Sequence, residues 1–102
     1  MKYIRTKDHL EELYVDEFTE YGKEYYKNSK IADTIEELCD EFVCLGSAEY
    51  QKYVKHSLKE ALQKKEWLER KGYTCNIYGA IWTDKGLIYV AKMNDKGELE
   101  LL

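Results

Sequence analysis

The last thirty residues of the chain, 73–102, alternate between apolar runs and short polar turns. The runs are TCNIYGAIWT, LIYVAKM and ELELL, and DKG and NDKG separate them. Ile, Val, Tyr and Trp, which suit a pleated and half-buried surface, dominate the first two runs. Each turn has its glycine where a type I turn with a bulge requires positive φ. The pattern predicts a three-stranded antiparallel meander.

A helical period precedes the meander in TIEELCDEFV, where five apolar residues share one face. Thr34 fits an N-cap, Glu37 is placed as its reciprocal partner three residues later, and Gly46 is placed to end the helix. These signals predict a short helix from Thr34 towards Gly46.

A longer helix is predicted from Ala48 to about Lys71, with Ser47 as its N-cap and Gly72 as its left-handed C′ residue. Tyr53 and Trp67 fall off its apolar stripe and close to each other around the helix axis. The stripe itself consists of Tyr50, Val54, Leu58, Ala61, Leu62 and Leu68.

The N-terminal residues give two kinds of signal. Residues 2–7, KYIRTK, alternate between polar and apolar side chains, which predicts a short first strand. Residues 8–22 have apolar positions at helical spacing, and we predict a helix there. The alternative takes LYVDEFTEYG, residues 13–22, as two extended pieces, because Tyr, Val, Phe and Thr also favour strands.

Together these patterns predict one α+β domain spanning residues 1–102. Its C-terminal three-stranded meander and short N-terminal strand would be covered by one long and one or two short helices. The first two meander strands are apolar on both faces, and one helical layer covers only one face. The other face therefore needs a second covering element or a second copy of the chain. Gly79, inside a strand, indicates a bulge or a close approach of another group, and we favour the close approach.

Composition narrows the class of protein. The chain has 102 residues, of which 44% are apolar, as expected for a globular domain rather than a disordered one. No run is long enough to span a membrane, and no signal peptide is recognised. Its three cysteines, an odd number without a framework, point to a reducing compartment. We therefore expect a cytoplasmic protein that does not associate with membranes.

Charge is unevenly distributed. The formal net charge is −4, but residues 8–41 hold twelve acidic residues against three lysines, whereas residues 42–72 are net positive. Such asymmetry fits either two solvated faces or an interaction surface. An acidic segment can also occupy a basic groove of a partner, as nucleic acid would. The candidate partner-binding residues are Glu36, Glu37, Asp40, Glu41, Tyr53 and Trp67.

No catalytic, cofactor-binding or metal site is predicted. Four residues separate Cys39 from Cys44, which does not match the close cysteine pairs of zinc sites. His56 lies among lysines, and no serine has the surroundings of a nucleophile elbow. The carboxylates of the short helix are expected at an exposed edge, without the shifted pKa values of acid–base catalysts. We therefore expect no enzyme activity.

Nucleic-acid binding is retained as an alternative function. The long helix carries seven Lys or Arg residues with Tyr53 and Trp67 nearby, as a basic stripe with aromatic residues would. However, the chain is acidic overall, with a pI near 5.2, and glutamates alternate with the lysines. We expect i,i+4 ion pairs such as Glu60–Lys64 instead, and nucleic acid is not the expected partner.

Two stretches carry a resemblance: KIADTIEELCDEFV, residues 30–43, and YGAIWTDKGLIYVAKMNDKGELELL, residues 78–102. With the opening MKYIRTKD, they resemble small uncharacterised proteins encoded in phages and prophages of Gram-positive bacteria. In those proteins the opening leads into a strand-rich stretch, from which DHLEELYVDEFTEYG departs. These strings contain no functional motif, so no functional residue is carried over. The resemblance implies a phage accessory protein, a class that includes many binders and inhibitors of host machinery.

The function expected from these observations is that of a non-enzymatic phage or prophage accessory protein. It would bind a protein of the bacterial host, and through its acidic segment it would inhibit a host defence or nucleic-acid-handling protein. The alternatives are a homo-oligomeric structural protein without a ligand and a nucleic-acid binder that uses the lysine-rich helix.

Overall fold

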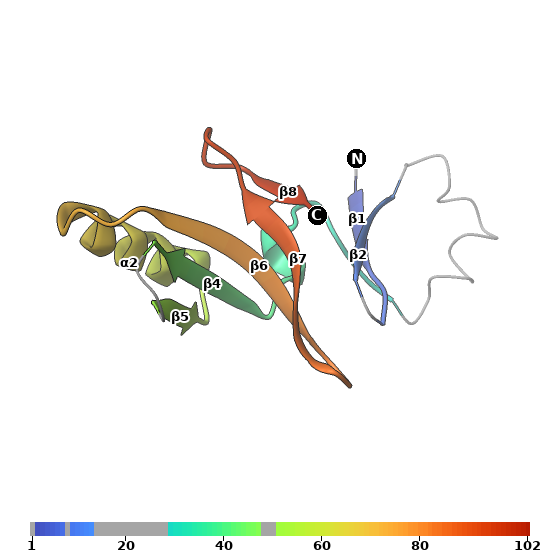
Figure 1. The fold of residues 1–102 in the computed structure, drawn as a ribbon. Helices are drawn as coiled ribbons and strands as arrows, with labels where there is room; N and C mark the ends of the chain where they lie inside the picture. The colour runs from blue at the N-terminus through green and yellow to red at the C-terminus, as the bar shows by residue number, and fades with distance from the viewer. Residues whose placement is uncertain (1, 8, 14–28, 48–50) are drawn as a thin grey trace.

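The computed structural model describes residues 2–7, 9–13, 29–47 and 51–102. Their strands form two antiparallel sheets (Figure 1). The small sheet has the order β2-β1-β3 and consists of β1 (Lys2–Arg5), β2 (Leu10–Leu13) and β3 (Lys30–Ala32). The large sheet has the order β5-β4-β6-β7-β8 and consists of β4 (Glu41–Gly46), β5 (Lys52–Lys55), β6 (Cys75–Thr83), β7 (Gly86–Met93) and β8 (Leu99–Leu101). One 3-10 turn, η2 (Glu36–Leu38), and one α-helix, α2 (Leu58–Arg70), complete the described elements.

The predicted meander is confirmed as β6, β7 and β8, which are neighbours in the sheet. Gly86 and Gly97 have φ values of 103° and 80°, as the two predicted turns require. The predicted first strand is also confirmed, as β1. The predicted fold class is nevertheless wrong, because the described structure is mostly β and the meander is only part of a five-stranded sheet.

The predicted helix from Thr34 towards Gly46 is wrong. Its first turn does form, since the backbone N–H of Glu37 donates to Thr34 Oγ1 at 3.3 Å, but the turn ends as η2. The chain then enters β4, whose last residue is Gly46. Three consecutive apolar side chains of β4 are buried, and a central strand of a sheet can bury such a run on both of its faces whereas an amphipathic helix cannot. These side chains are Phe42, Val43 and Cys44.

The long helix is ten residues shorter at its start than predicted, because it begins at Leu58 and not at Ala48. Its N-cap is Ser57, whose Oγ accepts a hydrogen bond from Glu60 N at 3.2 Å. Residues 52–55 form β5, in which exposed and half-buried side chains alternate. The predicted end of this helix is confirmed, since Gly72 follows the C-cap residue with a φ of 89°.

The prediction of a helix over residues 8–22 is wrong at Leu10–Leu13, which form β2 and pair with β1. Leu10 is buried in the core, so this strand is stabilised by tertiary contacts that a local period does not reveal. The remainder of that prediction, residues 14–22, lies outside the described residues, as does the alternative of two extended pieces beyond Leu13.

One face of the large sheet, which we call the covered face, carries two apolar cores. Side chains of a strand alternate between faces and paired residues share a face, so Cys75, Ile77, Gly79 and Ile81 of β6 all point to this one. The first core lies under α2 and consists of Phe42, Cys44, Ala61, Leu68, Cys75, Ile77 and Met93. The second lies under η2 and the small sheet and consists of Leu10, Ile35, Leu38, Ile81, Val90 and Ala91.

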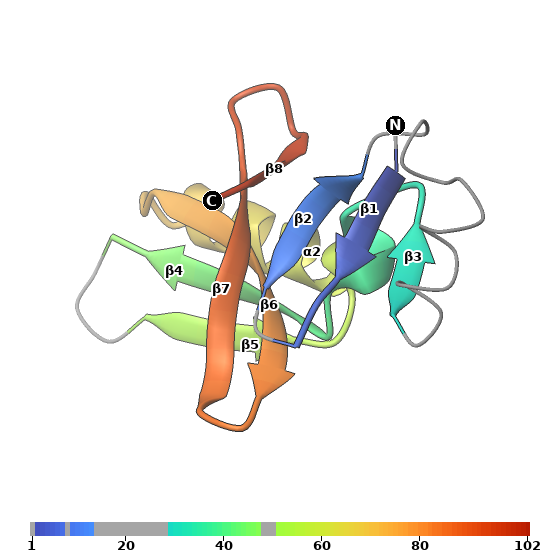
Figure 2. The ribbon, with the colours of Figure 1, turned by 90° about the vertical axis from the view of Figure 1, so that its right-hand side faces the viewer.

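The two covering layers sit at opposite ends of the large sheet (Figure 1). Figure 2 views the molecule from the small-sheet end, with β1 and β2 in front and α2 behind them. Between the two layers, Cys39 packs against both cores. Gly79 lies at this junction, and a Cβ placed on it would come within 2.6 Å of Cys39 Sγ. The predicted close approach is therefore confirmed, and a β-bulge occurs at the same place, because the register with β7 shifts between Gly79 and Ala80.

Candidate functional site

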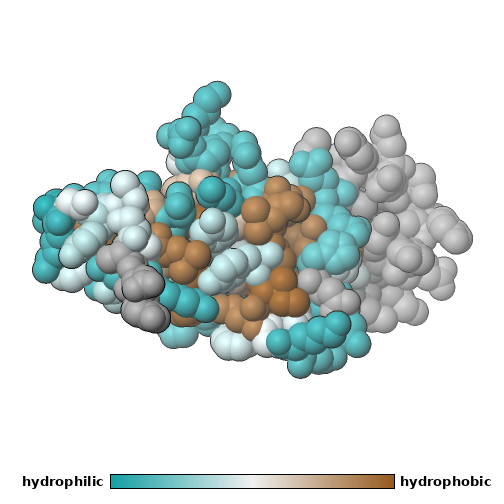
Figure 3. Space-filling view, viewed as in Figure 1, coloured by the Kyte–Doolittle hydropathy of each residue, from teal (hydrophilic) through white to brown (hydrophobic). Residues whose placement is uncertain are grey.

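The opposite face of the large sheet, which we call the open face, carries side chains from all five strands. By the same alternation, it consists of Glu41, Val43, Leu45, Lys52, Val54, Asn76, Tyr78, Ala80, Trp82, Leu87, Tyr89, Lys92 and Glu100. None of these side chains belongs to either apolar core, so within the described residues neither α2 nor the small sheet covers this face. Figure 3 shows apolar side chains gathered in the middle of this side of the molecule.

Two stacked tyrosines occupy the centre of the open face. The rings of Tyr78 and Tyr89 lie 5.1 Å apart at an interplanar angle of 22°. Lys52 Nζ lies 5.7 Å from the Tyr89 ring, and Lys92 Nζ lies 5.8 Å from the Tyr78 ring. We call these four side chains the aromatic column. Each cation is attracted by the electron-rich face of a ring, and the column can therefore hold its shape at a solvated surface.

Trp82 marks the end of the open face next to the β6–β7 turn. Its side chain is 55% exposed, and its cross-strand partner is Leu87. Two hydrogen bonds hold the backbone of Trp82: its N–H donates to Asp40 Oδ2 at 2.8 Å, and its carbonyl accepts from Arg5 Nη2 at 3.3 Å. A large indole is thus presented to solvent from a fixed backbone.

Arg5 and Asp40 form the ion pair behind Trp82. Arg5 Nη1 and Nη2 donate to the two carboxylate oxygens of Asp40 at 2.6 and 2.7 Å, a bidentate geometry. Partial burial alone would raise the pKa of Asp40, but the hydrogen bonds from Arg5 and from Trp82 N outweigh it and hold that pKa below 3.8. Because both side chains also hydrogen-bond to the Trp82 backbone, the pair connects β1 of the small sheet with β6 of the large sheet. We call Arg5, Asp40 and the Trp82 backbone the Trp82 clamp.

The predicted acidic surface does not form on one helix edge. Glu36 and Glu37 are exposed on η2, whereas Asp40 belongs to the Trp82 clamp. Glu41 is buried at the start of β4, with its Oε2 2.9 Å from Nδ1 of His56. Of the four candidate carboxylates, two are therefore engaged in contacts within the chain. The helical spacing that grouped them does not exist, because the chain changes from η2 to β4 between them.

Tyr53 and Trp67 are brought together, although not on one helix as predicted. Tyr53 belongs to β5 and Trp67 to α2, and Lys64 Nζ lies between them, 4.1 Å from the Tyr53 ring and 4.0 Å from the Trp67 ring. Lys71 Nζ lies 4.1 Å from the Trp67 ring as well. We call these four residues the Lys64 cluster.

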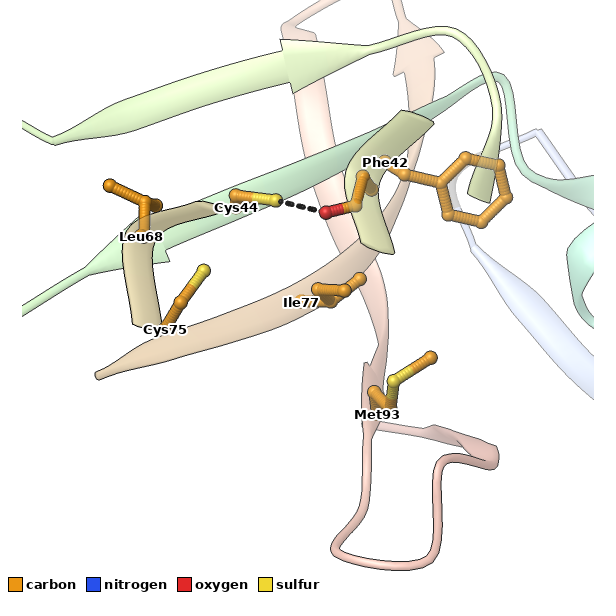
Figure 4. Close-up of a cluster of buried hydrophobic side chains, with 7 residues drawn as sticks. Phe42, Cys44, Leu68, Cys75, Ile77 and Met93 are labelled. Carbon is orange, nitrogen blue, oxygen red and sulfur yellow. Dashed lines mark hydrogen bonds between the residues drawn. The ribbon is translucent and has the colours of Figure 1, made fainter. Parts of the chain in front are cut away.

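The cysteines have the properties of core residues rather than of nucleophiles. Burial raises the pKa of the Cys39 and Cys44 thiols to about 12, so both stay protonated at neutral pH. Cys44 Sγ donates to the carbonyl of Ala61 at 3.1 Å, the bond drawn as a dashed line in Figure 4. Cys75 points into the same core, and burial raises its pKa too. Across the described residues, no three His, Cys, Asp or Glu side chains are grouped so that they could hold a metal ion.

Sequence reasoning missed Trp82 and its clamp. A signal for the indole was present, since Trp82 stands at an outward position of β6 directly before a turn, where a large apolar residue is not needed for folding. No signal in the sequence connects Arg5 with Asp40, because 35 residues separate them and neither position is part of a motif.

No helix in the part of the chain that the structure describes is long and apolar enough to cross a membrane. Comparison of the chain with protein-family models, with curated proteins and with solved structures gave no match.

Proposed function

We propose that this chain is a protein-binding module without catalytic activity and that it binds its partner on the open face around Trp82. The observation that carries the proposal is an exposed tryptophan on a clamped backbone, within a sheet face that no described core uses. Tryptophan, tyrosine and arginine dominate the few residues that supply most of the energy of protein interfaces. A backbone that is already held in place loses less entropy on binding.

The chemistry of the open face defines the partner. Trp82, Leu87 and the tyrosine edges offer apolar area, and Lys52 and Lys92 add two positive charges beside it. The two carboxylates of this face already have contacts within the chain, Glu41 with His56 and Glu100 with Asn94. The complementary surface is a protein segment with apolar side chains bordered by carboxylates. Positive charges at the border would mainly raise the association rate and select against basic partners.

The resemblance to phage and prophage proteins supports an accessory role, and we place the protein in the cytoplasm of a bacterial host. Inhibition of a host defence or nucleic-acid-handling protein remains the biological role that we propose. The structure changes the surface that we assign to it, from the acidic segment to the open face, because Asp40 and Glu41 make contacts within the chain.

A peptide-display selection against the intact chain tests this function and does not require the partner to be identified first. We expect enriched peptides to combine apolar residues with Asp or Glu, and Trp82→Ala to weaken their binding by about 10-fold or more. The matched control is Tyr73→Ala, which removes an exposed aromatic residue outside the open face and should leave binding unchanged.

A charge reversal sharpens the test. In the double variant Lys52→Glu/Lys92→Glu the selection should turn towards basic peptides. Peptides that bind equally well to Trp82→Ala would refute the assignment of the open face.

Light scattering tests the homo-oligomeric alternative. A dimer that Trp82→Ala abolishes would show that the occupant of the open face is a second copy of the chain and not a separate partner.

A further inference from the structure

The Lys64 cluster lies on a different surface, where β5 meets α2. Two other cations of the helix pair with acidic neighbours: Lys65 Nζ lies 3.4 Å from Glu69 Oε1, and Arg70 Nη2 lies 2.9 Å from Glu66 Oε1. The pair that the sequence suggests for Lys64, with Glu60, is not among the ion pairs of the described residues. Lys64 instead directs its charge onto the rings.

A shallow cavity of about 350 Å³ opens beside the cluster. Lys55, Glu60, Gln63, Lys64 and Trp67 line it. The lining therefore combines two ammonium groups, one carboxylate and an indole that is 41% exposed, and Lys71 adds a third ammonium on the Trp67 ring. The local charge is positive on a chain whose net charge is −4.

A ligand that fits must offer both negative charge and a flat ring. An anion alone would satisfy the ammonium groups but would leave the indole without a partner. An aromatic ring can stack on Trp67 in place of a lysine, and the displaced ammonium group is then close enough to pair with a phosphate. Unpaired nucleotides have both features, whereas a duplex keeps its base faces stacked on one another.

We propose that the Lys64 cluster binds single-stranded nucleic acid, with a base stacked on Trp67 and the phosphates contacted by Lys55, Lys64 and Lys71. Tyr53, on the neighbouring strand, is half-buried against the first core and helps to hold Lys64 at the site, with its ring 4.1 Å from the same ammonium group. This site does not depend on the open face, because Tyr53 points to the covered side of β5 and Trp67 belongs to α2.

Fluorescence anisotropy with a labelled oligothymidylate of about 12 nucleotides tests the proposal, at salt concentrations of about 50 and 200 mM. We expect binding at low salt, a marked loss of affinity at the higher salt, and weaker binding of the matching duplex. Trp67→Ala should weaken binding by about 10-fold, since base–aromatic stacking is of that size. Lys64→Gln should weaken it and reduce the salt dependence.

Two matched controls separate the site from general charge effects. Lys65→Gln removes a lysine that pairs with Glu69 and should change affinity little, and Trp82→Ala should have no effect. The protein has two tryptophans, so Trp82→Phe isolates the fluorescence of Trp67, which the oligonucleotide should quench. Thermal melting of each variant shows that it is folded.

The proposal is overturned by no binding at low salt, or by binding that Trp67→Ala leaves unchanged. Equal competition by heparin and by the oligonucleotide would also overturn it, because a polyanion without bases would then suffice. Competition by polyglutamate alone would show that the cluster binds an acidic protein segment. None of these results affects the proposed open-face interaction, which its own Trp82 variant tests.

Discussion

On the covered face of the large sheet, Ile77, Ile81 and Ala91 lie under α2, η2 and the small sheet and are almost inaccessible to water. On the open face, Trp82 and Val54 are 55% and 43% exposed. The strands are the same and each contributes alternate side chains to both faces. This difference shows that the contacts that stabilise the fold are concentrated on the covered face. The open face can therefore keep apolar residues for recognition.

The open face is not simply an unfinished core. Val43 and Ala80 on that face are fully buried, although no described helix or strand covers them. Both pair across strands with tyrosines of the aromatic column, Val43 with Tyr78 and Ala80 with Tyr89. Long side chains of the sheet itself therefore shield small neighbours. This arrangement protects the backbone and leaves the indole at one end exposed.

The largest effect is expected from a truncation beneath α2. Leu68→Ala should lower the free energy of unfolding by about 3 kcal/mol, because it removes a fully buried side chain and leaves a cavity. Val54→Ala, a truncation on the open face, should cost less than about 1 kcal/mol. Urea denaturation of both variants measures the contrast. Equal losses would mean that the open face is as important for folding as the covered one.

A smaller loss of unfolding free energy is expected for a substitution at the junction of the two covering layers. Gly79→Ala should cost about 2 kcal/mol, since its Cβ would lie 2.6 Å from Cys39 Sγ and the tightly packed junction must shift. The second substitution Cys39→Ala removes that sulfur and should recover part of the loss. A double-mutant cycle by urea denaturation measures this coupling. Additive losses in the cycle would rule out the steric cause.

The Trp82 clamp should make stability depend on acid. The folded pKa of Asp40 lies below its usual value of 3.8, so its contribution is complete above that value and is lost as the pH falls through the folded pKa. Asp40→Asn should cost about 1–2 kcal/mol at neutral pH and should flatten the decline of stability below about pH 4. Unfolding curves across pH 2–7 measure both. An unchanged acid profile in Asp40→Asn would assign the decline to other carboxylates.

The smallest effect is expected within the aromatic column. Lys92→Gln should destabilise the fold by only about 0.5 kcal/mol, because the cation–π contact is long and solvated. Its effect on peptide binding should exceed its effect on stability if the open face recognises carboxylates. Thermal melting and peptide titration of the same variant compare the two. A stability loss as large as that of Leu68→Ala would place the column in the core and not at a binding surface.

The parts of the fold that sequence reasoning predicted are those with local signals. Gly86 and Gly97 fix the hairpins by their positive φ, and Gly72 ends α2 for the same reason. The wrong parts have local signals that compete with pairing. Residues 34–43 have a helical spacing of apolar side chains, yet from Glu41 onwards the chain forms β4, whose backbone is satisfied by pairing with both β5 and β6.

The residues of the candidate site were likewise predicted only in part. Trp67 and Tyr53 were predicted to lie away from the core; the structure instead packs Tyr53 against the first core, and it brings both rings to one lysine from two different elements. Glu36, Glu37, Asp40 and Glu41 were grouped by a helix that is absent, so the structure separates them.

The sequence by itself determined the meander, its turns, the first strand and the excess of apolar residues on both faces of β6 and β7. These depend on backbone conformation and on side chains a few residues apart. Tertiary structure alone decided that the small sheet and α2 share one face, that Arg5 meets Asp40, and that Trp82 stays exposed. The physical reason is that such contacts join residues far apart in the chain, and many partners of similar chemistry compete for each of them until the whole core is packed.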